Sequence, residues 1–388
     1  MDFYTFGDAD AYEAYGQSCA GYVQGALGSC YNALRPVGIQ LYYGIPYLLS
    51  SDPVTIKVLT LLMNILCLWL LVTSCLSLYK TLMARSGQVY GVLRVGINKV
   101  VVSLGVLVLV VGFVPIRSPD LQGAAFFLAA VALLINDRFR DKPFFLIVSG
   151  LCAGISILLK QNYMVPSFLI VFFWCVLHFR FHIENRLKSL LCFLFGFSVC
   201  LIQMIMVYAH GGFPWFYDAA VMAKDYGVGN LQPYVELIAV TVPVGGAYMT
   251  QLAHPLSSID YVAVKFFAGM YKFYWTIYLG NPPYDISPAV VQYSRGRLNL
   301  LICSMVALLV VSALTYFARN KWIFNIAMTS FVSAFATAVI MHTENRYYVI
   351  NKIMFLIVFV VVVNLLLDKL IARYGTKHPV TTNGVQIE

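Results

Sequence analysis

Apolar runs long enough to cross a lipid bilayer recur along most of this chain and restrict its fold more than any other feature. A transmembrane helix needs about 20 apolar residues, because it rises about 1.5 Å per residue across about 30 Å of hydrocarbon. About nine such runs are present, near 54–79, 97–115, 121–136, 143–159, 164–179, 189–209, 299–317, 323–341 and 347–367. With 60% hydrophobic residues, 11% charged residues and a mean hydropathy of +0.78, an ordinary soluble domain is excluded. The sequence therefore predicts an all-α polytopic membrane protein.

Lysine and arginine side chains indicate how these runs are oriented. They gather after every second run and in the tail, so the positive-inside rule makes those segments cytoplasmic. The residues concerned are Arg85, Arg94, Lys99, Arg138, Arg140, Lys142, Arg180, Arg186, Lys188, Arg319, Lys321, Lys369, Arg373 and Lys377. Residues 1–53 contain one base, Arg35, against five acids, so we expect them outside. The net charge of +9 therefore reflects topology, and it gives no reason to expect a nucleic-acid partner.

The chain divides into five segments by composition. We predict an outside (periplasmic) loop at 1–53, transmembrane helices at 54–209, a second outside loop at 210–298, transmembrane helices at 299–367 and a cytoplasmic tail at 368–388. In the second loop, charges, a proline and glycines interrupt apolar stretches at 234–250 and 259–279. We expect interfacial or re-entrant helices there, with a pair of spans as the alternative. Cys19 and Cys30 could form a disulfide outside, although their spacing alone leaves this open.

A polar cluster stands between the last two apolar runs. It contains His342, Glu344, Arg346 and Tyr347, so it puts an acid and a base at the mouth of an apolar segment. A charge near the hydrocarbon costs several kcal/mol, and such residues usually serve a function. The cluster therefore predicts a substrate cavity.

Carboxylates near the N-terminus offer a general base. Asp8 and Tyr12 are four residues apart and lie on one face of a predicted short helix. Asp10 could be the N-cap of that helix, with Glu13 completing a capping box. Asp8 would then remain to take a proton from an acceptor hydroxyl. Alternatively, Asp8 and Asp10 could bind a cation.

Four bases lie at the predicted outer ends of different spans, against the cytoplasmic bias that other bases show. They are Arg35, Arg117, Lys160 and Arg346. A single lysine at such a place could reach to lipid headgroups, and Arg35 could pair with Asp8, Asp10 or Glu13. Their convergence on one side instead favours a lipid-linked phosphate, which guanidinium and ammonium groups bind through charge-assisted hydrogen bonds.

The succession of these motifs resembles a known family. In order they are Asp8 with Tyr12, Arg35-Pro36, Ser118-Pro119-Asp120-Leu121, Gly150-Leu151-Cys152-Ala153-Gly154 leading to Lys160-Gln161, and Glu344-Asn345-Arg346-Tyr347. The succession is similar to that of the GT-C superfamily of polyprenyl-phosphate-sugar glycosyltransferases, over roughly residues 6–360. The resemblance implies a bundle of about 9–11 transmembrane helices with outward-facing loops that carry short amphipathic helices. Members usually have a membrane helix ahead of the catalytic loop, whereas this chain starts at that loop, so such a helix could lie upstream.

The resemblance also implies roles for individual residues. Asp8 would be the catalytic base, with Asp10 in reserve, and no cofactor is expected, although a divalent metal at these carboxylates stays open. Lys160 and Arg346 would hold the donor phosphate, and Glu344 would bind sugar hydroxyls or orient Arg346. The remaining predicted substrate-binding residues are Tyr12, Arg35, Arg117, Asp120, Gln161 and Tyr347.

Compact members of the family suggest a particular reaction. We expect glucose to move from undecaprenyl-phosphate-glucose to a cell-surface or lipid-linked glycan such as O-antigen, with inversion. The protein would lie in a bacterial inner membrane, with its active site facing the periplasm and its C-terminus in the cytoplasm. Lipid A, arabinan and protein acceptors stay open. The alternative is a transporter or flippase of a lipid-linked saccharide, which the scarcity of charge in mid-membrane disfavours, and a structural scaffold would leave the polar clusters unexplained.

Overall fold

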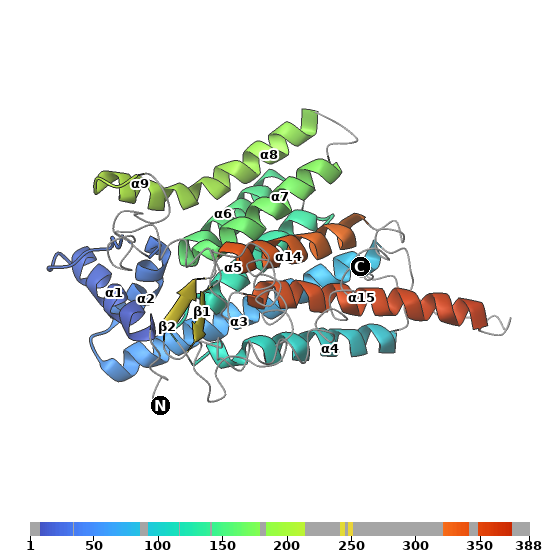
Figure 1. The fold of residues 1–388 in the computed structure, drawn as a ribbon, viewed down its shortest axis with the longest axis horizontal. Coiled ribbons are helices and arrows are strands. Elements are labelled where there is room, and N and C mark those ends of the chain that lie inside the picture. The colour runs from blue at the N-terminus through green and yellow to red at the C-terminus, as the bar shows by residue number, and fades with distance from the viewer. Residues whose placement is uncertain are drawn as a thin grey trace.

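The fold is a bundle of helices with one short pair of strands (Figure 1). The computed structural model describes residues 8–33, 35–85, 92–115, 117–139, 142–178, 184–213, 241–244, 247–250, 321–340 and 348–374. The helices are α1 (Asp8–Val23), α2 (Val37–Leu49), α3 (Pro53–Ala84), α4 (Val92–Val110), α5 (Asp120–Ile135), α6 (Pro143–Leu159), α7 (Met164–His178), α8 (Glu184–Phe197), α9 (Leu201–Ala209), α14 (Lys321–Ile340) and α15 (Val349–Tyr374). The strands are β1 (Thr241–Val244) and β2 (Ala247–Thr250).

The described helices confirm a membrane-embedded, all-α protein. Four helical segments are long and apolar enough to cross a bilayer, at Pro53–Ala84, Leu93–Phe113, Leu187–Ala209 and Val349–Ile371. Shorter apolar helices occur at Asp120–Ile135, Pro143–Leu159 and Trp322–Thr337. Every predicted apolar run within the described residues is helical, and the run at 299–317 lies outside them. The full number of spans stays a prediction.

Successive helices run back and forth along the long axis of the molecule, while α1 and α2 lie at one end of it (Figure 1). The connections 111–119 and 160–163 lie at this α1/α2 end, and the ends of α3 and α5 lie at the opposite end. Arg85, Lys142 and Lys188 therefore share the opposite end, as the charge pattern predicts.

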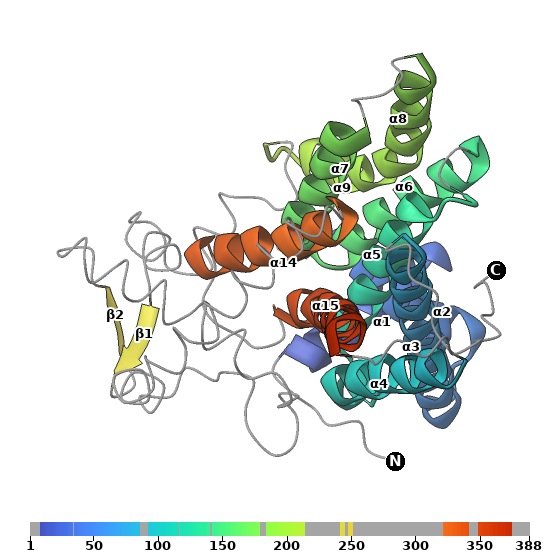
Figure 2. The ribbon, with the colours of Figure 1, turned by 90° about the vertical axis from the view of Figure 1, so that its right-hand side faces the viewer.

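Helix α15 is one of the buried helices of the bundle. It contacts α3, α4, α5 and α14 (Figure 2), and 72% of its most apolar stretch is buried. The corresponding stretches of α3, α4 and α8–α9 are only 22–33% buried. Their exposed apolar side chains, such as Trp69, Leu104 and Phe195, form a surface suited to lipid.

Glycines set the close crossing of α6 and α8. A Cβ atom on Gly150 would lie 2.0 Å from the Phe193 carbonyl oxygen, and one on Gly196 would lie 2.0 Å from the Ile147 carbonyl oxygen. Small residues allow helix backbones in membranes to approach in this way. The Gly150 and Gly154 pair, spaced as G-x-x-x-G, therefore has a packing role on α6.

Replacing Gly150 by alanine is expected to destabilise the fold by about 3 kcal/mol, because a backbone oxygen cannot move aside for the new methyl group. Gly96→Ala is the matched control, since nothing lies within 4 Å of the added carbon. Thermal unfolding in detergent would compare the two. Equal melting temperatures for both variants would contradict this packing role.

The strand pair corrects the prediction for the second outside loop. β1 and β2 are antiparallel, and their register pairs Thr241 with Thr250 and Val244 with Ala247. A helix over 234–250 is therefore wrong for 241–250. Pro243 disfavours a helix interior. The stretch 259–279 lies outside the described residues.

Candidate functional site

Helix α1, which begins at Asp8, contains three of the acidic residues near the N-terminus. Asp10 lies in the first turn and is exposed, so the predicted capping box, with Asp10 as N-cap, is wrong. The Glu13 carboxylate has other partners. It accepts a hydrogen bond of 2.5 Å from the Tyr47 hydroxyl of α2, and it forms an ion pair with Arg117. Glu13 thus ties α1 both to α2 and to the turn before α5.

Tyr12 and Arg35 meet on the neighbouring face of α1. Tyr12 is 4% exposed, and its ring is parallel to that of Tyr43, with 6.2 Å between the ring centroids. The Arg35 guanidinium lies 5.8 Å from the centroid of the Tyr12 ring, within the range of a cation–π interaction. Of the carboxylates that Arg35 could pair with, Glu13 forms an ion pair with Arg117, and the side chain of Asp8 lies outside the described ones.

The second ion pair joins Asp120 and Lys160. Asp120 is the first residue of α5 and is fully buried. Its carboxylate accepts a hydrogen bond from the Ser118 hydroxyl and pairs with the Lys160 ammonium. Lys160 caps the C-terminus of α6 in an extended conformation, which directs the chain into the turn 161–163. The Tyr163 hydroxyl then donates to the Asp120 carbonyl at 3.0 Å.

These two ion pairs lie in one cluster, because α1, α2, the turn 117–120 and the turn 160–163 meet at the α1/α2 end (Figure 1). The Tyr43 ring is parallel to that of Tyr12, and Tyr43 is close enough to Asp120 to interact with it electrostatically. Burial raises the pKa of Tyr43 well above its ordinary value, with smaller contributions from Tyr42, Tyr12 and Asp120. Its hydroxyl therefore keeps its proton, and it is buried without a hydrogen-bond partner among the described residues.

Hydrogen bonds to buried side-chain amides join the α1/α2 end to the membrane helices. The Asn64 side chain of α3 accepts hydrogen bonds from the Tyr42 hydroxyl at 3.0 Å and from the Gln122 amide at 2.6 Å. Gln203 of α9 accepts a 2.7 Å bond from the backbone N–H of Val37. Sequence reasoning missed these residues. Their only signal is that each of the three amides interrupts an apolar run.

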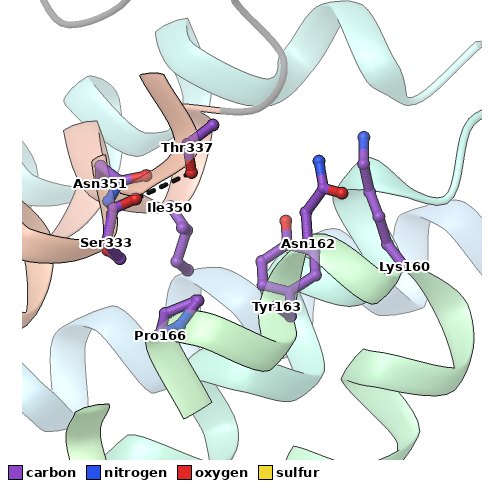
Figure 3. Close-up of a pocket in the computed structure, with 8 residues that line it drawn as sticks. All are labelled: Lys160, Asn162, Tyr163, Pro166, Ser333, Thr337, Ile350 and Asn351. Atoms are coloured by element: carbon purple, nitrogen blue, oxygen red, sulfur yellow. Dashed lines mark hydrogen bonds between the residues drawn. The ribbon is translucent and has the colours of Figure 1, made fainter. Parts of the chain in front are cut away.

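A small pocket lies beside this cluster (Figure 3). One wall consists of Lys160, Asn162, Tyr163 and Pro166, and the other consists of Ser333 and Thr337 of α14 with Ile350 and Asn351 of α15. Its volume is about 10 Å³, which suits a single water or hydroxyl group. Sequence reasoning missed α14 here, although its polar residues recur every fourth position, at Asn325, Thr329, Ser333 and Thr337.

The pocket lies between chain segments that flank the predicted site residues just before α15. Glu344, Arg346 and Tyr347 lie outside the described residues. The described residues on either side of them, Thr337 and Ile350, nevertheless line the same pocket as Lys160. Chain segments about 180 residues apart therefore converge here.

The remaining predicted residues are placed as follows. Gln161 is half-buried, and its side-chain oxygen has no hydrogen-bond partner within the described residues. Nowhere in the described ranges do three His, Cys, Asp or Glu side chains gather as a metal site would require. Glu13 and Asp120 are each paired with a base instead.

A disulfide between Cys19 and Cys30 closes the loop after α1. The two Cα atoms are 4.2 Å apart, and the neighbouring Ser29 N–H donates to the Ser18 hydroxyl at 3.0 Å. The pairing that the spacing left open is thus present. It holds the end of α1 near the chain that leads to Arg35.

Converting both bonded cysteines to serine is expected to lower stability by about 2–4 kcal/mol, chiefly because the unfolded chain loses a constraint. Thermal unfolding would measure this, with Cys192→Ser, a change at an unbonded cysteine, as the control. Mass analysis that finds both thiols free in the unreduced protein would contradict the bond.

Comparison with models of protein families, with curated proteins and with solved structures gave no match. The functional argument therefore rests on the geometry of the site.

Proposed function

We propose that this protein is an inverting glycosyltransferase that moves glucose from a polyprenyl-phosphate donor to a cell-surface glycan such as O-antigen. The α1/α2 end faces the periplasm in this proposal, and the protein lies in a bacterial inner membrane with its C-terminus in the cytoplasm. The observation that carries the proposal is the convergence of Arg35, Arg117 and Lys160 with the carboxylate-bearing helix α1. A donor phosphate at the membrane surface needs such bases, and an acceptor hydroxyl needs such a carboxylate.

The Lys160 ammonium is placed before any donor arrives. Asp120, which has no exposed surface, holds it at the wall of the pocket through their ion pair. Fixed charges of this kind stabilise a leaving group without reorganisation during the reaction. Asp120 is in this view a positioning residue for Lys160.

The proposed reaction is a single displacement. Asp8 takes the proton from the acceptor hydroxyl as the acceptor oxygen forms a bond to the anomeric carbon. The bond from that carbon to the phosphate oxygen breaks on the opposite face, and its electron pair leaves with the polyprenyl phosphate. Lys160, together with Arg346, stabilises the phosphate charge that develops. Arg117 acts indirectly, since its pairing with Glu13 holds α1 beside the turn 117–120.

Reconstitution of the purified protein tests the proposal. Liposomes that contain the protein, undecaprenyl-phosphate-glucose and a lipid-linked O-antigen acceptor are expected to yield acceptor molecules heavier by one hexose. A chelator arm decides whether a divalent metal takes part. Failure to transfer any sugar to any of the glycan, lipid A or protein acceptors would overturn the proposal.

One observation favours the alternative, a transporter or flippase. Asn325, Thr329 and Ser333 are fully or almost fully buried along α14, so polar groups continue from the pocket toward the opposite end of the bundle. The two functions separate in liposomes without acceptor. Movement of a fluorescent polyprenyl-phosphate-glucose between leaflets supports transport, whereas its absence, together with transfer in the liposomes that contain the acceptor, supports the transferase.

A further inference from the structure

The pocket beside Lys160 presents hydrogen-bonding groups with almost no net charge. Lys160 is the only charged residue among the described residues that line it, and its charge is balanced by buried Asp120. The other polar groups are the side chains of Asn162, Tyr163, Ser333, Thr337 and Asn351. Such a lining suits a neutral polar group.

The directions of the hydrogen bonds in the pocket indicate which kind of neutral polar group it can bind. The Asn162 side-chain nitrogen is buried and has no hydrogen-bond partner in the described part of the chain, so it needs an acceptor. The Thr337 hydroxyl donates its proton to the Ser333 carbonyl at 2.8 Å (Figure 3), so its oxygen can only accept further bonds. A single group that accepts from Asn162 and donates to Thr337 satisfies both, and a hydroxyl has this property.

The size of the pocket agrees with this chemistry. A volume of about 10 Å³ holds one water-sized group and not a sugar ring. Lys160 and Asn162 extend in the same direction beside Tyr163, across the pocket from Thr337 (Figure 3). A sugar held by its phosphate near Lys160 would therefore place one hydroxyl group in the pocket.

We propose that this pocket binds one hydroxyl group of the donor sugar and thereby selects sugars with that hydroxyl over sugars that are deoxygenated there or carry an ammonium group there. The proposal rests on the proposed function. An ammonium group in the pocket would be repelled by the Lys160 ammonium, which lines it. A deoxy position would leave the Asn162 nitrogen buried without a partner, which is costly.

The test measures donor binding as well as transfer. Undecaprenyl-phosphate-glucose, its four monodeoxy analogues and the corresponding glucuronic acid and glucosamine donors are titrated against the reconstituted protein, with thermal stabilisation as the binding readout. One deoxy analogue is expected to bind at least about tenfold more weakly than the parent donor, and so is the glucosamine donor if that analogue is the 2-deoxy sugar.

Thr337→Val removes the accepting oxygen with little change in shape. This variant is expected to bind the parent donor more weakly, with an affinity within about threefold of that for the deoxy analogue that binds worst to the unaltered protein. Asn162→Leu is a second variant with the same expected result. Thr81→Val is the matched control, because Thr81 makes the same bond to a preceding carbonyl, at 2.9 Å, but lies near the end of α3.

Each possible outcome supports or contradicts the hydroxyl site or the proposed function. Equal binding of all analogues by the unaltered protein, or unchanged discrimination in both pocket variants, overturns the hydroxyl site even where glucose is transferred. Discrimination in binding without any transfer keeps the hydroxyl site and removes the proposed function. Absence of binding by every donor removes both.

Discussion

Asp8→Asn is expected to lower the rate of sugar transfer by about 10²–10⁴-fold, the contribution typical of a positioned general base. Asparagine has nearly the same shape as aspartate but cannot take a proton from the acceptor hydroxyl. Asp8 starts α1, which is fixed at its second turn by the ion pair between Glu13 and Arg117. Donor binding and the melting temperature should therefore stay near those of the unaltered protein.

Steady-state transfer from undecaprenyl-phosphate-glucose, measured beside donor binding, checks this result. Asp10→Asn is the matched control, since Asp10 is an exposed carboxylate in the same turn of α1. Full turnover by Asp8→Asn would remove Asp8 as the base. Loss of turnover in Asp10→Asn alone would assign that role to Asp10.

Asp120→Asn is expected to destabilise the protein by about 3–5 kcal/mol, because it leaves the Lys160 ammonium without its buried partner. Asp120 is fully buried and the Lys160 side chain is 11% exposed, so water cannot replace the lost carboxylate. Transfer should also fall, since Lys160 would no longer be held at the pocket wall. Thermal unfolding and transfer assays on the same preparation would measure both effects.

An exposed ion pair elsewhere in the protein provides the control for this prediction. Arg85 pairs with Asp137 at 2.7 Å, but the Asp137 side chain is 55% exposed, so Asp137→Asn should cost less than about 1 kcal/mol. Combining Asp120→Asn with Lys160→Met removes both charges and should recover most of the lost stability without restoring transfer. Similar melting temperatures for the Asp120 and Asp137 variants would show that the buried ion pair contributes no more to stability than the exposed one.

The helices could be predicted well because a single physical quantity determines them. Apolar segments in a membrane must satisfy their own backbone hydrogen bonds, so each described run became a helix. The strand pair at 241–250 was missed because hydropathy does not separate a short apolar hairpin from an interrupted helix. The start of α1 was predicted three residues late, with Asp10 as its N-cap, because a carboxylate in the first turn resembles an N-cap.

The candidate site could be predicted only in part. The positions of Arg117 and Lys160 at the ends of apolar runs showed that they would share one end of the bundle. The carboxylates that pair with these two bases could not be predicted from the apolar runs. Glu13 is 104 residues from Arg117, and Asp120 is 40 residues from Lys160, so only helix packing brings these carboxylates to their bases.

The sequence by itself determined that the chain enters a membrane, where its described helices lie and which bases share an end, because hydropathy and charge act locally along the chain. Only the tertiary structure decided that Lys160 is balanced by Asp120 and that α14 completes the pocket beside it. Such choices depend on which side chains meet across packed helices, and the free energy of burying a charge or an amide is set by those neighbours.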